Sequence, residues 1–133
     1  MIREFKKIVI KIGSTSIVDS KTKKIKSKWL VKLCKDIAFL HKTKKIVIVC
    51  SGAIALGSKS ISKSILRKLE DKQAAASIGQ IELAHQWRTK LKKFKINVSQ
   101  ILLTIEDSEV RRRYLNAKNT ISSLQNKGVI PII

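Results

Sequence analysis

The stretch from Ile46 to Gly57 constrains the possible folds of this chain more than any other part of the sequence. It reads IVIVCSGAIALG, so five apolar residues run directly into Ser51 and Gly52, and a second apolar run follows. A short run rich in β-branched residues is typical of a strand buried on both faces, as in a parallel sheet. Ser51-Gly52 allows a sharp turn into a helix whose first N–H groups lack partners and can hold an anion. Taken alone, the stretch also fits an ordinary strand-to-helix turn without a ligand.

A second stretch of the same design lies near the start of the chain. From Phe5 to Ser16 the sequence reads FKKIVIKIGSTS, with an apolar run that ends in Lys11, Gly13 and three small hydroxyl residues. Ligands bind at the carboxyl edge of the strands in open α/β sheets. Two strands of this type, parallel and side by side, would bring Lys11 and Ser51 to one rim of the sheet. We therefore expect a single site at this rim.

The remaining sequence alternates helix and strand signals. Apolar residues at spacings of three and four predict a helix with Ser27 as N-cap up to about His41, and a long helix over 72–93 capped by Asp71. We expect a short helix over 53–56 and a polar, solvated loop over 19–26. Strands are expected over 98–104 and 129–133, with an amphipathic helix between them that ends at Gly128. This alternation predicts an α/β fold with a doubly wound parallel sheet.

The long helix has a predicted inward stripe and one interruption. A glycine inside a helix costs about 1 kcal/mol relative to alanine, so Gly79 indicates close packing or the close approach of a ligand. We favour core packing. The predicted inward positions are Ala74, Ala75, Ala76, Ile78, Ile81, either Ala84 or His85, Trp87 and Leu91.

The last predicted strand, VIPII at 129–133, is apolar at every position. Such a strand belongs inside a sheet, with further elements covering its faces. We therefore expect the sheet to be truncated after about four strands, a number that follows from the alternation of elements.

The formal net charge of +20 makes a basic nucleic-acid-binding module the first alternative class. Most of the charge is lysine in clusters expected at loops and helix ends, where lysine favours solubility. No nucleic-acid-binding motif accompanies these clusters, and aromatic residues at 5% are too few for a stacking platform. We therefore expect no specific nucleic-acid partner.

The cysteines and the N-terminus indicate a cytoplasmic chain. Cys34 and Cys50 have no CxxC spacing and no nearby His cluster, so we predict buried reduced thiols and no disulfide framework or metal site. The N-terminal MIREFKK lacks the apolar core of a signal peptide. No apolar run approaches the roughly 20 residues of a membrane span, so no membrane partner is expected.

Several segments, in the same order and at similar spacing, resemble the glutamate 5-kinases of the amino acid kinase family. They are KIGSTS at 11–16, VIVCSGAIALG at 47–57, KQAAASIGQ at 72–80, and the run from QILLT through RRRYLNAKNT to VIPII at 100–133. The resemblance implies a three-layer αβα sandwich with a mainly parallel sheet. It also implies phosphorylation of the side-chain carboxylate of L-glutamate by ATP, with Mg²⁺ bound through the nucleotide, as the first step of proline biosynthesis.

The resemblance assigns roles to individual residues. Lys11 would be catalytic and would neutralise phosphate oxygens of ATP, since this transfer needs positioned positive charge. The N–H groups of Gly13 and Ser14 would hold other phosphate oxygens. No metal ligand is implied. The substrate-binding set would be Ser51, whose hydroxyl meets glutamate, with the N–H groups of Gly52 and Ala53 as anion donors.

The family carries further functional segments after the VIPII-like strand. They are an acidic, Asn-rich motif that holds glutamate, a second phosphate-binding lysine and the nucleotide pocket. We therefore expect residues 1–133 to be the N-terminal, glutamate-binding part of an amino acid kinase domain, without its C-terminal nucleotide-binding half and with little activity alone. The complete protein is expected to be a homo-oligomer. A catalytically dead remnant that acts in assembly remains a second alternative.

Overall fold

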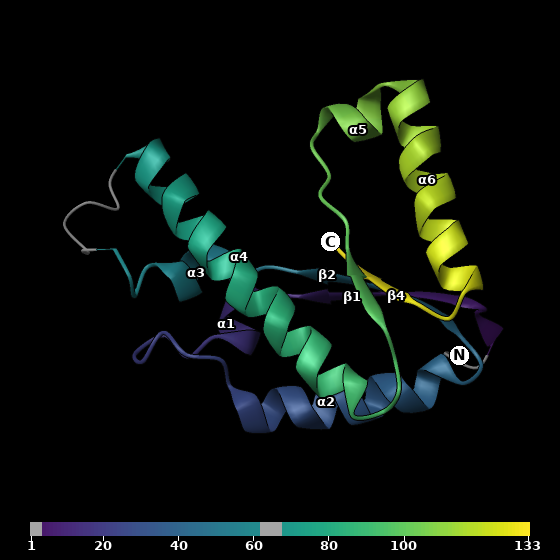
Figure 1. Ribbon diagram of the computed structural model, residues 1–133, viewed down its shortest axis with the longest axis horizontal. Coiled ribbons are helices and arrows are strands. Elements are labelled where there is room, and N and C mark those ends of the chain that lie inside the picture. The colour runs from purple at the N-terminus through teal and green to yellow at the C-terminus, as the bar shows by residue number, and fades with distance from the viewer. Residues whose placement is uncertain (1–3, 62–67) are drawn as a thin grey trace.

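The computed structural model describes residues 4–61 and 68–133, and its strands form one sheet (Figure 1). The four strands lie in the order β1-β2-β4-β3, and every adjacent pair is parallel. The predicted α/β fold is therefore confirmed. β3 is shorter than the predicted 98–104 because the chain leaves the sheet after the Ile101 N–H bonds the Ile132 carbonyl. The strands are β1 Lys7–Ile12, β2 Lys45–Cys50, β3 Val98–Gln100 and β4 Ile130–Ile132.

Helices cover both faces of the sheet, which gives three layers. The helices are α1 Ser14–Ile17, α2 Ser27–His41, α3 Ala53–Gly57, α4 Leu69–Lys92, α5 Glu106–Glu109 and α6 Arg111–Asn126. Side chains of α2 and α4 share one buried cluster with Ile46 and Ile48 of β2. α6 faces the opposite side of the sheet, where it forms a groove with Val9 and Val47. No helix among the described residues is long and apolar enough to cross a membrane.

The core lies between the central strands and the pair α2 and α4. Trp87 is its largest fully buried side chain, and Ile48 and Ile130 of the same cluster are also fully buried. Burying each large apolar side chain contributes about 1.5–3 kcal/mol relative to leaving it exposed. β4 is buried at every position, as the apolar VIPII sequence predicts, because it pairs with β2 on one side and β3 on the other.

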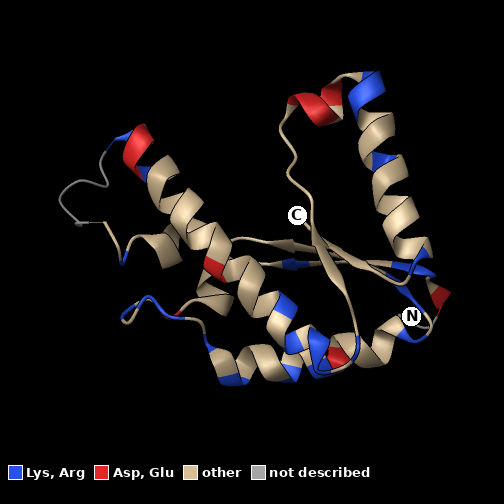
Figure 2. Ribbon diagram, viewed as in Figure 1, with Lys and Arg blue, Asp and Glu red and all other residues tan. Residues whose placement is uncertain are grey.

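Charged residues are unevenly distributed over these elements (Figure 2). Basic residues lie along α2 and at the C-terminal end of α4, where Lys90 and Lys92 are in the last turn. Acidic residues gather in the first turn of α4, at Glu70 and Asp71, and in α5. Both acidic groups lie at the N-terminal end of a helix, where they complement the helix dipole.

Ser27 and Asp71 are not the N-caps that the sequence predicts. Ser27 is the first residue of α2, which has Lys26 at its N-cap, and α4 begins at Leu69 with Lys68 at its N-cap. Neither cap residue makes a side-chain hydrogen bond to its helix. The chain therefore enters both helices about one to three residues earlier than cap propensity indicates, a difference typical of helix ends.

The buried face of α4 also differs in phase from the predicted stripe. Ile78 and Ile81 are 43% and 76% exposed, whereas Leu83 and Gly79 point inward. The phase follows from a close contact with α3, in which only a glycine of α4 fits. The buried residues of α4 are Ala75, Gly79, Leu83, Trp87, Lys90 and Leu91.

The helix α6 is amphipathic as predicted, yet none of its residues is buried. Its C-terminal end is attached to the sheet, because Gln125 Nε2 donates to the Ile46 carbonyl at 3.3 Å. The chain then turns at Gly128, which has a φ of +71° and ends the helix as predicted.

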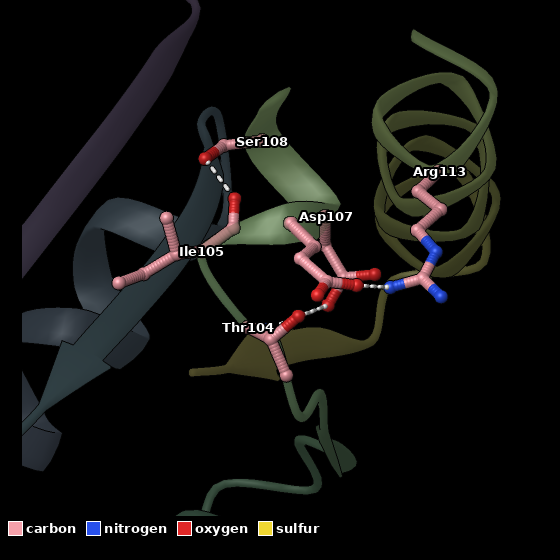
Figure 3. A network of polar contacts seen from close by, with 6 residues as sticks. Thr104, Ile105, Asp107, Ser108 and Arg113 are labelled. Atoms are coloured by element: carbon pink, nitrogen blue, oxygen red, sulfur yellow. Dashed lines mark hydrogen bonds and ion pairs between the residues drawn. The ribbon is translucent and has the colours of Figure 1, made fainter. Parts of the chain in front are cut away.

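A polar network holds the corner between α5 and α6 (Figure 3). The Thr104 N–H and hydroxyl donate to Asp107 Oδ2 at 2.6 and 2.8 Å. Arg113 of α6 forms an ion pair with Glu106 of α5. The hydrogen bonds from Thr104, with a smaller contribution from Arg113, lower the pKa of Asp107. Local polar contacts thus connect α5 with the residues on either side of it.

Candidate functional site

The turns that follow β1 and β2 lie side by side at the carboxyl edge of the sheet. The two strands pair in parallel with Lys11 opposite Val49 and Ile12 opposite Cys50. The Ser51 N–H continues this ladder and donates to the Ile12 carbonyl at 3.0 Å. The arrangement confirms that the two similar sequence stretches form adjacent strands with the same direction.

Glycine is required at position 52. Gly52 has a φ of +124°, a conformation that residues with a side chain rarely adopt. A Cβ there would lie 3.2 Å from methyl groups of both Ile17 and Val18 and 3.8 Å from the Ser14 Cα. The turn after β2 is therefore packed directly against α1, which follows β1.

A glycine contact between α3 and α4 fixes the other side of the turn. A Cβ on Gly79 would lie 1.8 Å from the Ala53 carbonyl oxygen, and one on Gly57 would lie 1.8 Å from the Ala75 carbonyl oxygen. Backbone meets backbone at both points. This confirms the packing interpretation of Gly79 and shows that α4 holds the start of α3 in place.

A cavity of about 590 Å³ opens beside these turns. This volume lies within the range of small-molecule sites, about 300–1,000 Å³. Among the described residues, its lining contains hydroxyl groups and a single charged side chain, that of Lys23, with no carboxylate. The cavity therefore suits an anionic ligand. The lining residues are Ser14, Lys23, Cys50, Ser51, Gly52, Ala53, Ile54, Ala55 and Ser58.

The cavity contains four of the predicted site residues, namely Ser14, Ser51, Gly52 and Ala53. Lys11 and Gly13 are close to Ser14 in the sequence, but neither of them lines the cavity. Side chains alternate along β1, and Lys11 belongs to the exposed set with Lys7 and Val9, opposite the face that packs on the core. The predicted residues thus share one edge of the sheet but not one cavity.

Sequence reasoning missed Lys23, which it placed in a solvated loop. In the structure Asp19 accepts hydrogen bonds from the Lys21 and Thr22 N–H groups at 3.0 and 2.7 Å, and Val18 forms a bridge with Ile25. The hydrogen bonds from Thr22 lower the pKa of Asp19. The aspartate followed by a threonine three residues later is a turn signal that could have indicated an ordered loop.

Cys50 lines the cavity but has the chemistry of a buried thiol. Burial raises the pKa of the Cys50 thiol, and its Sγ donates to the Ser51 carbonyl at 3.3 Å. Burial likewise raises the pKa of Cys34 to about 11. Both cysteines are free of disulfides. Since the thiolate is the nucleophile, neither cysteine is activated for catalysis.

The sequence profile of the amino acid kinase family matches residues 6–133. The chain belongs to the amino acid kinase family.

Within this family, the similar curated proteins are glutamate 5-kinases. The glutamate 5-kinase of Pelagibacter ubique is 53% identical over 135 residues, which cover 99% of this chain and 36% of the relative. Those of Rhodospirillum rubrum and Agrobacterium fabrum are each 50% identical and cover 94% and 96% of this chain. The chain spans 34% and 33% of the length of these two relatives, which is about a third of each.

Proposed function

We propose that this chain forms the glutamate-binding part of a glutamate 5-kinase, which phosphorylates the side-chain carboxylate of L-glutamate with ATP. In this role the chain provides the N-terminal portion of an amino acid kinase domain, and the nucleotide-binding half is supplied by sequence beyond these residues. The proposal includes a cytoplasmic location, homo-oligomerisation of the complete protein, and no specific nucleic-acid partner.

The observation that carries the proposal is the anion-suited cavity beside Ser51, on the edge of the sheet that also holds Lys11. A kinase for an acidic amino acid must hold a carboxylate and a polyphosphate next to each other. The parallel pairing of β1 and β2 provides adjacent turns for these two groups. The family and the named relatives supply the reaction type.

In the proposed reaction an oxygen of the side-chain carboxylate attacks the terminal phosphorus of ATP. An acyl phosphate forms, and the bond to the departing ADP breaks. The Ser51 hydroxyl and the N–H groups of Gly52 and Ala53 hold the glutamate. The Lys11 ammonium neutralises charge on the phosphate oxygens, and the Gly13 and Ser14 N–H groups bind others.

The turn after β1 has room for phosphate. A Cβ at Gly13 would meet no atom within 4 Å, and its φ of −74° is open to any residue, so the described fold does not itself require glycine there. A glycine at such a point lets a ligand approach the backbone closely. In the proposal Mg²⁺ is held through the nucleotide phosphates, and it would add positive charge beside Lys11.

A chimera tests the assignment of Lys11 and Ser51. Residues 1–133 replace the matching first third of the Pelagibacter ubique glutamate 5-kinase, and L-glutamate-dependent ADP release is measured. In this chimera Lys11→Ala should lower kcat by about 10²–10³-fold, the effect of removing one group that stabilises developing charge. Ser51→Ala should chiefly raise the KM for glutamate, by about tenfold for one lost hydrogen bond.

Lys7→Ala is the matched control, because Lys7 lies on the same strand and the same face as Lys11 but at the opposite end of the strand. It should leave kcat and KM unchanged. The 133-residue chain alone should show little or no turnover. Values for Lys11→Ala and Ser51→Ala equal to those of the parent chimera would refute both assignments, and measurable turnover by the isolated chain would refute its dependence on a second half.

A further inference from the structure

Within residues 4–61 and 68–133, Lys23 is the one charged residue in the lining of the cavity beside Ser51. It also lines an adjoining cavity with Leu56 of α3 and Glu82 of α4, so it lies on the side of α3 that faces α4. Lys11, in contrast, belongs to the face of β1 opposite the core. The neighbouring lysines of the same loop are engaged elsewhere or do not reach this cavity. Lys26 Nζ donates to the Thr15 carbonyl at 2.8 Å, and Lys21 is not part of the lining.

The backbone of the loop holds Lys23 in an uncommon conformation. Its φ is +54°, in the left-handed region that residues with a side chain seldom occupy. The Lys23 N–H donates to the Asp19 carbonyl at 2.9 Å, and the Asp19 N–H donates to the Lys24 carbonyl at 2.9 Å. Such a conformation persists only when its surroundings enforce it, and it is more frequent at ligand sites.

The ammonium group of Lys23 has no partner of its own within residues 4–61 and 68–133. No hydrogen bond or ion pair of its side chain is formed there, although the residue is only half exposed. Its charge is therefore available to a ligand. A charge-assisted hydrogen bond from an ammonium to a carboxylate is stronger than one between neutral groups.

We propose that Lys23 is a positioning residue that binds the α-carboxylate of the amino acid substrate in this cavity, an inference that rests on the proposed function. The carboxylate that reacts must lie toward Lys11 and Gly13, where the phosphates are placed. The α-carboxylate at the other end of the same molecule is then the group that meets Lys23, which lines this cavity. Lys23 thus selects an amino acid with a free α-carboxylate and orients its other end for reaction.

The test compares two ligands on the 133-residue chain by nuclear magnetic resonance. L-Glutamate and its α-amide are titrated at matched ionic strength, and the amide resonances of Gly52 and Ala53 report binding. The wild-type chain should bind L-glutamate about tenfold more tightly than the α-amide, as expected for one charge-assisted hydrogen bond. Lys23→Asn should lose this preference, while its affinity for the α-amide stays the same.

Lys23→Asn is chosen because asparagine tolerates a positive φ, so the loop keeps its conformation and loses only the charge and its reach. Lys23→Arg should retain the preference, which a merely structural role would not require. Lys21→Met is the matched control on the same loop and should behave as wild type.

The outcomes separate this inference from the proposed function. If Ser51→Ala weakens both ligands while Lys23→Asn keeps the full preference for L-glutamate, the inference is wrong and the proposed function stands. The inference is also overturned if Lys23→Asn loses the preference of L-glutamate over glutamine, the side-chain amide, but keeps the preference over the α-amide. Lys23 would then bind the side-chain carboxylate, which is the one that reacts. If L-glutamate shifts neither Gly52 nor Ala53 in the wild-type chain, both are wrong.

Discussion

Single residues at the carboxyl edge depend on backbone conformations that few amino acids adopt. Gly52 and Lys23 have φ values of +124° and +54°, and both line the same cavity. The sequence predicted the first because a glycine after a strand is a local turn signal. It did not predict the positive φ of Lys23, because the position of this residue depends on contacts that form only when the lysine-rich loop is folded. The residue types alone therefore indicated Gly52 but not Lys23.

The turn around Asp19 predicts a pH dependence of the loop. The folded-state pKa of Asp19 is lowered, mainly by hydrogen bonds from Thr22. The carboxylate therefore stabilises the loop fully above the ordinary pKa of aspartate, about 3.9, and this stabilisation is lost as the pH falls through the lower, folded-state value. The Thr22 amide resonance should titrate with a midpoint below about 3.9.

Asp19→Asn serves as the control for this titration. It removes the ionisable group, so the Thr22 amide should then show no transition in the same pH range. A midpoint at or above the ordinary value in the wild-type chain would mean that the hydrogen bonds to Asp19 do not favour its charged form in solution.

At the scale of elements, the sequence predicted the strands and the longer helices, but not the short helices α1 and α5 or how the helices are rotated. Apolar spacing placed α2 and α4 correctly to within a few residues. Apolar spacing predicted that Ile81 points inward, but this side chain is 76% exposed. The prediction was wrong because a spacing rule cannot include the backbone contact between α3 and α4. The amphipathic α6 was likewise predicted, yet its apolar residues, such as Tyr114 at 48% exposure, are not buried by the described residues.

Gly79→Ala tests the contact between α3 and α4. In an exposed helix this change would stabilise by about 1 kcal/mol. Here the new Cβ would lie 1.8 Å from the Ala53 carbonyl oxygen and 2.6 Å from the Gly57 nitrogen, so the helices must move apart. We expect the free energy of unfolding in urea to fall by about 1–3 kcal/mol, the usual effect of overpacking.

Ser77→Ala is the control on the same helix, since Ser77 is exposed and bonds only the carbonyl of Ala74 in its own helix. It should leave the free energy of unfolding unchanged or raise it slightly. If Gly79→Ala is as stable as the wild-type chain, the two helices are farther apart than the structure places them.

For the whole molecule, the order of strong apolar runs predicted a parallel sheet with helices on both faces, and this architecture is confirmed. The apolar VIPII strand was expected inside the sheet and lies there, between β2 and β3. The strand order itself was not predicted beyond the neighbours β1 and β2, because it depends on which crossovers pack together. The net charge of +20 indicated nucleic-acid binding as an alternative class. The match over residues 6–133 is instead to the amino acid kinase family.

The central claim is that the turns after β1 and β2 form one ligand site. The most direct measurement is a map of backbone amide shifts in the 133-residue chain as L-glutamate is added. Ser14 and Ser51 through Ala53 should shift together and saturate with one dissociation constant, while Lys45 and Gly128, at the opposite edge of the sheet, should not move. Saturating shifts at the opposite edge, or different dissociation constants for the two turns, would contradict the account.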